Sequence, residues 1–355
     1  MPGSRSRRAR PARADRPGPR PTGGPQLAGG PRPGQRVVPG VASLALLDVL
    51  RGPLRPGRVL AASPTVVYLD FGAAEVIALT AAGAGCPPNA VMLKLTTLEQ
   101  PPGPGLDGAP GTPKTDVEPG PGQPGPSQPG DDAWAGNGRV VVGGLDVQIR
   151  RWWDPCPVFG PLSRARLDHG VTTLARVYAA AAIRPGLEGH DSPAALAACC
   201  AAGDLAGAVE LAEDLVGLGP GLVPSGDSML CGLLLALRLL GGATAGGTRP
   251  VWLADWLGAA VTGYAEQRTT ALAAALLHCA ARGQASEEVA AVLHGIAGQE
   301  PVEPAARRLL AASRASGAEL TWGLMAGCAA ALALSVPPDA TRIAREARSL
   351  PGWQP

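Results

Sequence analysis

The pattern of apolar positions changes character once along this chain, near residue 155. Before that point, apolar residues gather in short β-branched runs separated by Gly and Pro, which predicts strands. The runs are RVLAA (58–62), TVVYLDF (65–71), AEVIALT (74–80), AVMLKLTTL (90–98) and RVVVGGLDVQIRR (139–151). A short helix over 43–50 is expected to lead into them. The pattern therefore predicts a small β-rich domain over residues 37–155.

From Ser163 onward, apolar residues recur with the period of an α-helix, in Ala/Leu segments divided by Gly or Pro. Helices are predicted over 163–182, 193–201, 204–216, 225–240, 251–281, 286–297, 303–313, 317–334 and 338–348. Several segments are apolar nearly all round, which indicates buried helices in a bundle. Strands first and helices second predict an α+β fold, with a β-rich domain followed by an Ala/Leu-rich α-helical bundle over 163–348.

Two stretches contain no apolar run around which a core would form. Residues 1–36 hold nine Arg and one Asp among many Pro and Gly, which predicts a disordered basic arm. Residues 101–138 are a Pro/Gly run, which predicts a flexible insertion inside a hairpin of the β-rich domain. For the arm, contact with RNA or anionic lipid is the alternative to a solvated tail, and the solvated tail is favoured.

The charge distribution and the cysteine content limit which partners and which cellular compartment are expected. The arm carries +8 of a net charge of +2, so the rest of the chain carries about −6, which argues against a nucleic-acid partner. The Arg-rich start leads into Pro and Gly where a signal peptide would have an apolar stretch. The seven Cys include no C-x-x-C pair and are typical of buried thiols in a reducing compartment. We expect a cytoplasmic protein.

One apolar segment tests the membrane alternative. The sequence LTWGLMAGCAAALALSV at 320–336 carries no charge, but it is short for a span and rich in Ala and Gly. It is better explained as a buried helix, and no membrane partner is expected.

Two segments of the helical part resemble each other without gaps. SGDSMLCGLLLA at 225–236 aligns on SGAELTWGLMAG at 316–327. The small residues Ser225, Gly232 and Ala236 match Ser316, Gly323 and Gly327. Separations of seven and eleven residues place these positions on one helix face. Each helix is therefore expected to begin at a Ser and to carry a stripe of small residues that lets another backbone approach.

The first candidate site is the Gly/Pro turn at 217–224 and the helix start that follows it. Ser225 is expected to be an N-cap and Asp227 to lie in the first turn, where exposed N–H groups attract anions. The alternative is that Ser225 and Asp227 only cap the helix. Ser316 and Glu319 repeat the arrangement at the second helix start, and duplication of a helical unit would explain that equally well.

A second candidate is the polar break at Arg268, Thr269 and Thr270. A guanidinium flanked by two hydroxyls suits phosphate or carboxylate oxygens, which Arg binds in a bidentate manner. The alternative is a surface Arg beside a Thr N-cap.

The sequence contains no complete motif for a nucleotide cofactor or a metal ion. A Walker A loop needs Gly-Lys-Ser/Thr, and the only lysines are Lys94 and Lys114, neither in such a turn. A dinucleotide fingerprint fails because Gly219 and Gly221 follow a helix-like segment instead of a strand. The four His show no metal spacing, and His278 is expected to be a core or rim residue. We therefore expect no cofactor and no metal.

An ordered set of motifs resembles the AllH-type family, a bacterial domain long catalogued as having unknown function. The motifs are RRWWDPCP (150–157), GLGPGLVPSGDSMLCGLLLAL (217–237), RTTALAAALLHCAARGQASEEV (268–289) and SGAELTWGLMAG (316–327). With the β-rich start, the resemblance covers about residues 37–336. The family pattern is similar to G-L-T-P-S-G-D-D; here Val223 replaces the Thr and Ser228 replaces the second acid, while Asp227 remains.

The resemblance implies a subunit of an oxamate carbamoyltransferase-like complex, in which oxalurate and phosphate become oxamate and carbamoyl phosphate during allantoin breakdown. It implies an FdrA-like protein and other subunits as partners, and a small anion as substrate. The expected substrate-binding residues are Gly219, Gly221, Ser225, Gly226, Asp227, Arg268, Thr269, Thr270, Ser316, Gly317 and Glu319. Two classes of function stay open. The chain is either an enzyme subunit of a carbamoyltransferase, or a non-catalytic binding or regulatory module that associates with FdrA-like proteins.

Overall fold

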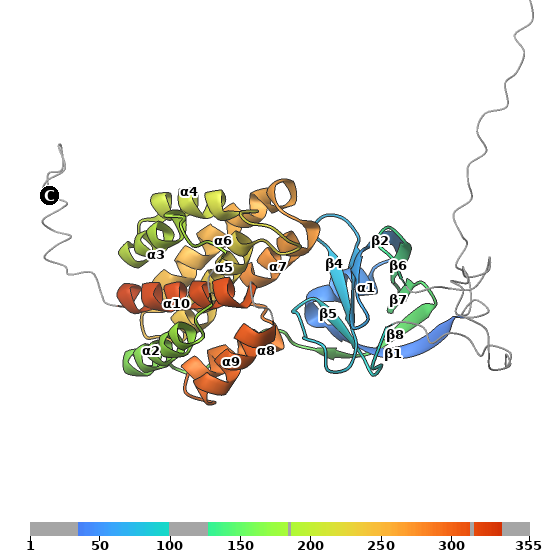
Figure 1. Ribbon diagram of the computed structural model, residues 1–355, viewed down its shortest axis with the longest axis horizontal. Helices are drawn as coiled ribbons and strands as arrows, with labels where there is room; N and C mark the ends of the chain where they lie inside the picture. Colours follow the sequence, from blue (N-terminus) through green and yellow to red (C-terminus); the bar gives the residue numbers. More distant parts are fainter. Residues whose placement is uncertain (1–34, 99–126, 184–185, 313–315, 336–355) are drawn as a thin grey trace, which may run out of the picture.

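The computed structural model describes residues 35–98, 127–183, 186–312 and 316–335. Two bodies make up this part of the chain, a β-barrel over residues 36–153 and a helical domain over residues 164–334 (Figure 1). The α+β class with strands before helices is thereby confirmed. The arm predicted over 1–36 lies almost wholly outside the described residues, and its last residue, Arg36, already pairs in the first strand.

The barrel is closed in the order β1-β5-β4-β3-β2-β6-β7-β8, and β8 pairs with β1. The pairs β1–β8 and β4–β5 are parallel, and the other neighbours are antiparallel. A 3-10 turn η1 (Leu44–Leu46) and a short helix α1 (Leu47–Arg51) follow β1, as the sequence predicts for 43–50. The strands are β1 (Arg36–Ser43), β2 (Arg55–Ala62), β3 (Val66–Asp70), β4 (Val76–Thr80), β5 (Ala90–Leu93), β6 (Asp132–Gly136), β7 (Arg139–Val142) and β8 (Leu145–Trp153).

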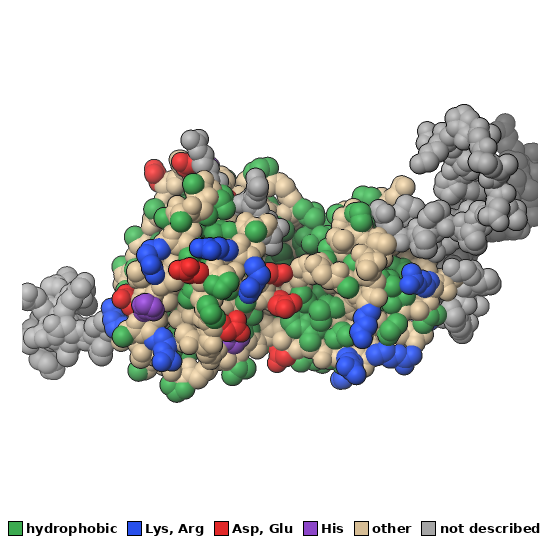
Figure 2. All heavy atoms as spheres, turned by 60° about the horizontal axis from the view of Figure 1, so that its bottom comes forward, with side chains coloured by type: hydrophobic (Ala, Val, Ile, Leu, Met, Phe, Trp, Pro, Cys, Tyr) green, Lys and Arg blue, Asp and Glu red, His purple; other side chains and the backbone are tan. Residues whose placement is uncertain are grey.

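Strand β4 is buried on both faces and joins the two bodies. Its residues Ile77 and Leu79 belong to the barrel core, whereas Val76 packs outward against Leu272 and Ala275 of the helical domain. A strand covered on both sides reads as a continuous apolar run, which accounts for the sequence VIAL over its first four residues. The space-filling view shows the two bodies meeting at a waist (Figure 2).

The insertion predicted over 101–138 is too long and is wrongly placed inside a hairpin. Strand β6 (Asp132–Gly136) occupies its C-terminal end and pairs with both β2 and β7. The segment links β5 to β6, which are not neighbours, because β4, β3 and β2 lie between them in the barrel. Sequence inspection missed β6 because DAWAG is short and continues a Gly/Asp-rich stretch. Residues 99–126 of the predicted insertion lie outside the described residues.

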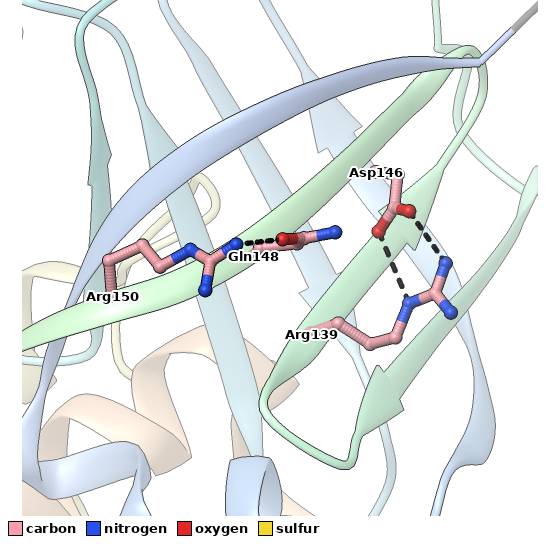
Figure 3. A network of polar contacts seen from close by, with 4 residues as sticks. All are labelled: Arg139, Asp146, Gln148 and Arg150. Carbon is pink, nitrogen blue, oxygen red and sulfur yellow. Dashed lines mark hydrogen bonds and ion pairs between the residues drawn. The ribbon is translucent and has the colours of Figure 1, made fainter. Parts of the chain in front are cut away.

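Strands β7 and β8 carry a buried charge pair that needs no ligand to satisfy it. Arg139 donates two hydrogen bonds, of 3.2 and 2.7 Å, to the two carboxylate oxygens of Asp146, which is 1% exposed (Figure 3). A bidentate pair of this kind stabilises a carboxylate that burial would otherwise penalise. Further along β8, Arg150 donates a hydrogen bond to the side-chain oxygen of Gln148. We therefore treat this network as part of the barrel framework.

The helical domain contains nine α-helices among the described residues. They are α2 (Arg164–Ala180), α3 (Ser192–Ala202), α4 (Leu205–Leu215), α5 (Ser225–Leu235), α6 (Thr248–Arg268), α7 (Ala271–Ala281), α8 (Glu287–Ile296), α9 (Val302–Ala312) and α10 (Ser316–Leu334). The π-helical turn η2 (Ala236–Gly241) continues α5. The single helix predicted over 251–281 is wrong, because Thr269 is extended (φ −133°, ψ −178°) and separates α6 from α7. The helix predicted over 338–348 lies outside the described residues, and the simple bundle arrangement stays a prediction.

Helix α10 runs through the helical domain, where α2, α3, α5 and α9 pack against it (Figure 1). By length and composition it is long and apolar enough to cross a membrane, but 72% of its apolar window is buried inside the protein. This agrees with the expectation of a buried helix for 320–336. The small residues of α10 then serve contact with other helices.

The internal repeat packs against itself in α5 and α10. A Cβ atom added at Gly232 would lie 2.2 Å from the Leu320 carbonyl oxygen, and one added at Gly323 would lie 2.0 Å from that of Met229. These contacts exchange equivalent positions of the two units. Ser225 meets Glu319 at the helix starts and Ala236 meets Gly327 further along, so the helices run parallel and begin at the same end. The stripe of small residues predicted from the repeat is the contact surface between its two copies.

The corrected limit of the insertion gives a first prediction. Replacing 101–126 by a short Gly/Ser linker is expected to change the melting temperature little, because the composition of that segment offers no packed core. Replacing 101–136 also removes β6, leaves β2 and β7 each without one of their two neighbours, opens the barrel, and should lower the melting temperature by more than about 10 °C. Thermal unfolding followed by circular dichroism compares the two variants. Equal melting temperatures would show that the barrel does not depend on β6.

Candidate functional site

The structure brings the turn 217–224 together with the starts of α5 and α7. Asp227 is the residue that connects them. Its carboxylate, 0% exposed, accepts a hydrogen bond from the Gly217 N–H (3.1 Å) through Oδ1 and one from the Thr269 hydroxyl (2.5 Å) through Oδ2. Sequence reasoning placed Asp227 correctly in the first turn of α5, but the structure directs its side chain to two other segments.

Burial and hydrogen bonding act in opposite directions on Asp227. Burial raises the pKa of this carboxyl above its ordinary value of 3.8, and the hydrogen bonds from Thr269 and Gly217 lower it in part. In the described part of the chain, Arg268 forms no salt bridge with Asp227. Its carboxylate is engaged by Gly217 and Thr269 instead.

Thr270 provides a second connection between the turn and α7. Its side-chain oxygen accepts from the Ala273 N–H (3.1 Å) as the N-cap of α7, and its hydroxyl donates to the Leu222 carbonyl (2.6 Å). The alternative of a surface Arg beside a Thr N-cap is thus correct for the cap itself. Asp227 thus links Gly217, at the start of the turn, to Thr269. Thr270 links Leu222, near the end of the turn, to the start of α7.

Glycines let the backbones in this junction approach closely. Gly217 has φ +76°, and an added Cβ would lie 2.0 Å from the Arg268 carbonyl oxygen. At Gly226 an added Cβ would lie 1.9 Å from the Leu215 carbonyl oxygen. Gly217 and Gly226 are therefore required by contact between main chains, whereas the positive φ of Gly219 and Gly221 favours glycine at those positions.

Ser225 does not cap α5, contrary to the sequence expectation. The helix is preceded by Pro224, and no side chain caps it. The Ser225 hydroxyl instead donates to Glu319 Oε1 of α10 at 3.3 Å, across the interface between the two repeat units. The reason is the parallel pairing of α5 with α10, which directs Ser225 toward the partner helix.

Glu319 lies at the inner side of this junction and is 0% exposed. Its Oε1 also accepts from the Gly186 N–H, a contact that no local sequence signal indicates because the two residues are far apart in the chain. Its Oε2 has no hydrogen-bond partner among the described residues. Of the other residues at this helix start, Ser316 is half-buried, and Gly317 packs on α9, where an added Cβ would lie 2.6 Å from the Leu309 carbonyl oxygen.

The N–H groups at the start of α5 are partly occupied by the protein itself. Gly226 N–H donates to the Leu218 carbonyl (2.9 Å), and the first residues of the helix are buried. The outer part of the turn, residues 219–222, is exposed, and so is Arg268. An anion in solution can therefore reach the rim formed by residues 219–222 and Arg268, but not the Asp227 carboxylate.

The two departures from the G-L-T-P-S-G-D-D pattern lie on the inner side of the turn. Ser228 is 2% exposed, and its hydroxyl donates to the Pro224 carbonyl (3.2 Å). Val223 packs with Val76 and Leu272 where the barrel meets α7. Both substitutions thus change packing behind the rim, and neither removes a group from the exposed rim itself.

Among the described residues, no cluster of side chains suits a metal ion, and no cysteine forms a disulfide. No group of three or more His, Cys, Asp or Glu side chains gathers there as a metal site. All seven Cys are free, and five are buried. Burial raises the pKa of Cys279 to about 12, so this thiol beside the barrel stays protonated at neutral pH.

Comparison with known proteins finds one family model that matches part of the helical domain. Residues 215–328, from the end of α4 into α10, match a family model described as oxamate carbamoyltransferase subunit AllH. The match includes Asp227, Arg268, Thr269 and Thr270, and it leaves the barrel outside. No curated protein and no solved structure matched the chain. The family match supports the assignment of this chain to the AllH-type family.

Proposed function

We propose that this protein is a subunit of an oxamate carbamoyltransferase-like complex, which converts oxalurate and phosphate into oxamate and carbamoyl phosphate. The single observation that carries the proposal is the family match over residues 215–328, which suggests a role as a subunit related to oxamate carbamoyltransferase. The placement in allantoin breakdown and in the cytoplasm belongs to the same proposal.

The small carbamoyl or carboxylate anion is proposed to bind at the rim. Arg268 supplies a full positive charge, Gly219 is exposed on the turn, and Gly221 leaves the main chain open to a ligand. Asp227, Thr269 and Thr270 contribute by holding the turn in place. Ser225, Gly226, Ser316, Gly317 and Glu319 form the buried side of the same junction and have a supporting role.

The partner proteins are proposed to include an FdrA-like protein. In the described part of the chain, the two acids of the repeat units, Asp227 and Glu319, both face inward at 0% exposure. That geometry favours a chain that binds or presents a ligand while a partner subunit completes the reacting centre. It also agrees with the alternative, a non-catalytic binding or regulatory module that associates with FdrA-like proteins.

The decisive assay uses the protein purified with its native partners and measures phosphate-dependent cleavage of oxalurate. Arg268→Gln is expected to lower the rate at least tenfold, because an exposed anion contact is lost without disturbing the fold. Arg308→Gln, on the exposed surface of α9, is the matched control and should retain full activity. Carbamoyl phosphate formation is followed directly. A wild-type complex without oxalurate cleavage would contradict the enzyme proposal and leave the binding module.

A further inference from the structure

Helix α6 carries an exposed aromatic face that the core of the helical domain does not use. Trp252, Trp256 and Tyr264 are 49%, 53% and 51% exposed, although aromatic residues make up only 3% of the chain. The other sides of α6 pack against α4 and α7 (Figure 1). Aromatic side chains gathered on one surface, with the core complete beneath them, indicate an interaction surface.

The aromatic half of this face is followed by a flat half. Trp252, Trp256, Ala259 and Gly263 are separated by four, three and four residues, so they lie on one side of the helix and span about 17 Å. Ala259 is exposed, and a Cβ atom added at Gly263 would meet none of the described residues within 4 Å. The two Trp rings contact each other edge to face, with centroids 6.3 Å apart. The face therefore presents a paired aromatic projection beside a shallow surface.

A second copy of this face is complementary to it in shape. When two α6 helices pack antiparallel about a two-fold axis, the two Trp side chains of each copy cover Ala259 and Gly263 of the other. A parallel pair would instead set Trp against Trp and leave the flat halves uncovered. The large and small residues of α6 thus favour the antiparallel arrangement.

The charges on this face permit contact between identical surfaces. In a two-fold contact, a group near the axis meets its own copy, so an unpaired charge there would be repelled. Between residues 252 and 263 the only charged residue is Asp255, and Arg238 of η2 pairs with it. The axis falls between Trp256 and Ala259, where the sequence has no charge. A strongly charged partner would find no complementary charge on this stretch, so the observations favour a second copy.

The area of the face matches a dimer of modest affinity. Since a covered aromatic side chain buries about 150–250 Å², three half-exposed ones offer roughly 300 Å² per copy and roughly 600 Å² in the dimer. The remaining exposed positions of α6 bring the area near the total of about 1,000 Å² that a specific interface needs. We expect a dissociation constant on the order of 10 μM.

We propose that α6 packs antiparallel on α6 of a second copy, so that its aromatic face is the interface of a homodimer. Trp256 lies nearest the two-fold axis and contributes most, because an aromatic anchor at the centre of an interface is fully desolvated. Arg268 lies beyond the contact stretch, at the end of α6, and the dimer leaves it exposed. The inference stands on the surface of α6 and is independent of the proposed function.

Sedimentation velocity on the full chain, from about 1 to 100 μM, measures the equilibrium between monomer and dimer. The wild type is expected to pass from monomer to dimer over this range. Trp256→Ala should weaken the dimer at least about tenfold, and the double variant with Trp252→Ala should be monomeric throughout. Val158→Ala is the matched control, because it trims an apolar side chain that is 81% exposed between β8 and α2. It should dimerise as the wild type does.

Ala259→Arg tests the same contact without removing an aromatic group. It sets two like charges beside the axis and should abolish dimerisation. Because Ala259 is exposed, the circular dichroism spectrum and the melting temperature of this variant should match those of the wild type. The wild-type dimer should persist in about 0.5 M NaCl, since its contact is apolar, whereas association through the Arg-rich residues 1–36 would be lost.

The outcomes decide between this interface and the others. A chain that stays monomeric at every concentration would overturn the inference, and so would a dimer that persists in the double Trp variant or in Ala259→Arg. Dissociation in salt, or equal weakening by Val158→Ala, would place the contact elsewhere and overturn it too. Loss of the dimer in the α6 variants, with retention in Val158→Ala, supports the interface whatever the oxalurate assay shows.

Discussion

Replacing Gly323 by alanine should destabilise the helical domain by roughly 3–5 kcal/mol, more than a usual overpacking substitution. The added Cβ would lie 2.0 Å from the Met229 carbonyl oxygen and 2.9 Å from the Leu233 nitrogen, all within the α5–α10 interface. Both atoms belong to a helix backbone, so they cannot move aside as a flexible side chain would. The two helices must separate, and the contacts along their length weaken.

The matched control is Gly263→Ala on the exposed face of α6, where an added Cβ meets nothing within 4 Å. That variant should be stabilised by about 0.5–1 kcal/mol, because Ala has the higher helix propensity. Gly232→Ala, whose Cβ would lie 2.2 Å from the Leu320 carbonyl oxygen, should behave like Gly323→Ala. Urea unfolding of the three variants measures the difference. A Gly323→Ala protein as stable as Gly263→Ala would contradict the close packing of the two repeat units.

Replacing Asp227 by alanine should cost about 2–5 kcal/mol of folding free energy. The substitution leaves the Gly217 N–H and the Thr269 hydroxyl without their acceptor in a buried place, and each unsatisfied donor costs roughly 1–3 kcal/mol. Asp214→Ala, an exposed acid near the end of α4, is the control and should change stability by no more than about 0.5 kcal/mol. Equal unfolding midpoints for the two variants would show that Asp227 does not hold the junction.

Asp227→Asn separates the hydrogen bonds from the charge. The amide oxygen can accept from Gly217, and the amide nitrogen can donate to the Thr269 oxygen, so the fold should be retained. Because burial raises the folded-state pKa of Asp227, the stability that this residue contributes is fully present below the ordinary value of 3.8 and is lost as pH rises through the folded value. The stability of the wild type relative to Asp227→Asn should therefore fall as pH rises through this window and stay level above it. A difference that increases with pH would mean that the carboxylate is stabilised by the fold.

Local sequence signals determined where most elements begin and what they are. A Thr beside Arg268 was recognised as a possible cap, and Thr270 is the N-cap of α7, because a cap depends on residues within one turn. The β-branched runs became β3, β4 and β5, and the Ala/Leu segments became helices, since each pattern reports which face of its own segment is buried. The repeat that includes Gly232 and Gly323 likewise predicted a close contact with another helix. The structure shows that each repeat helix makes this contact with the other.

Only the tertiary structure decided which segments meet. The pairing of β1 with β8 closes the barrel across more than a hundred residues, and the sequence of neither strand indicates which strand it pairs with. Ser225 resembles a cap in sequence but bonds to Glu319, and Asp227 bonds to Gly217 and Thr269, because polar side chains serve whichever donors the packed helices bring to them. The sequence defines each segment's own geometry and buried face. The choice among competing partners belongs to the packing of the whole chain.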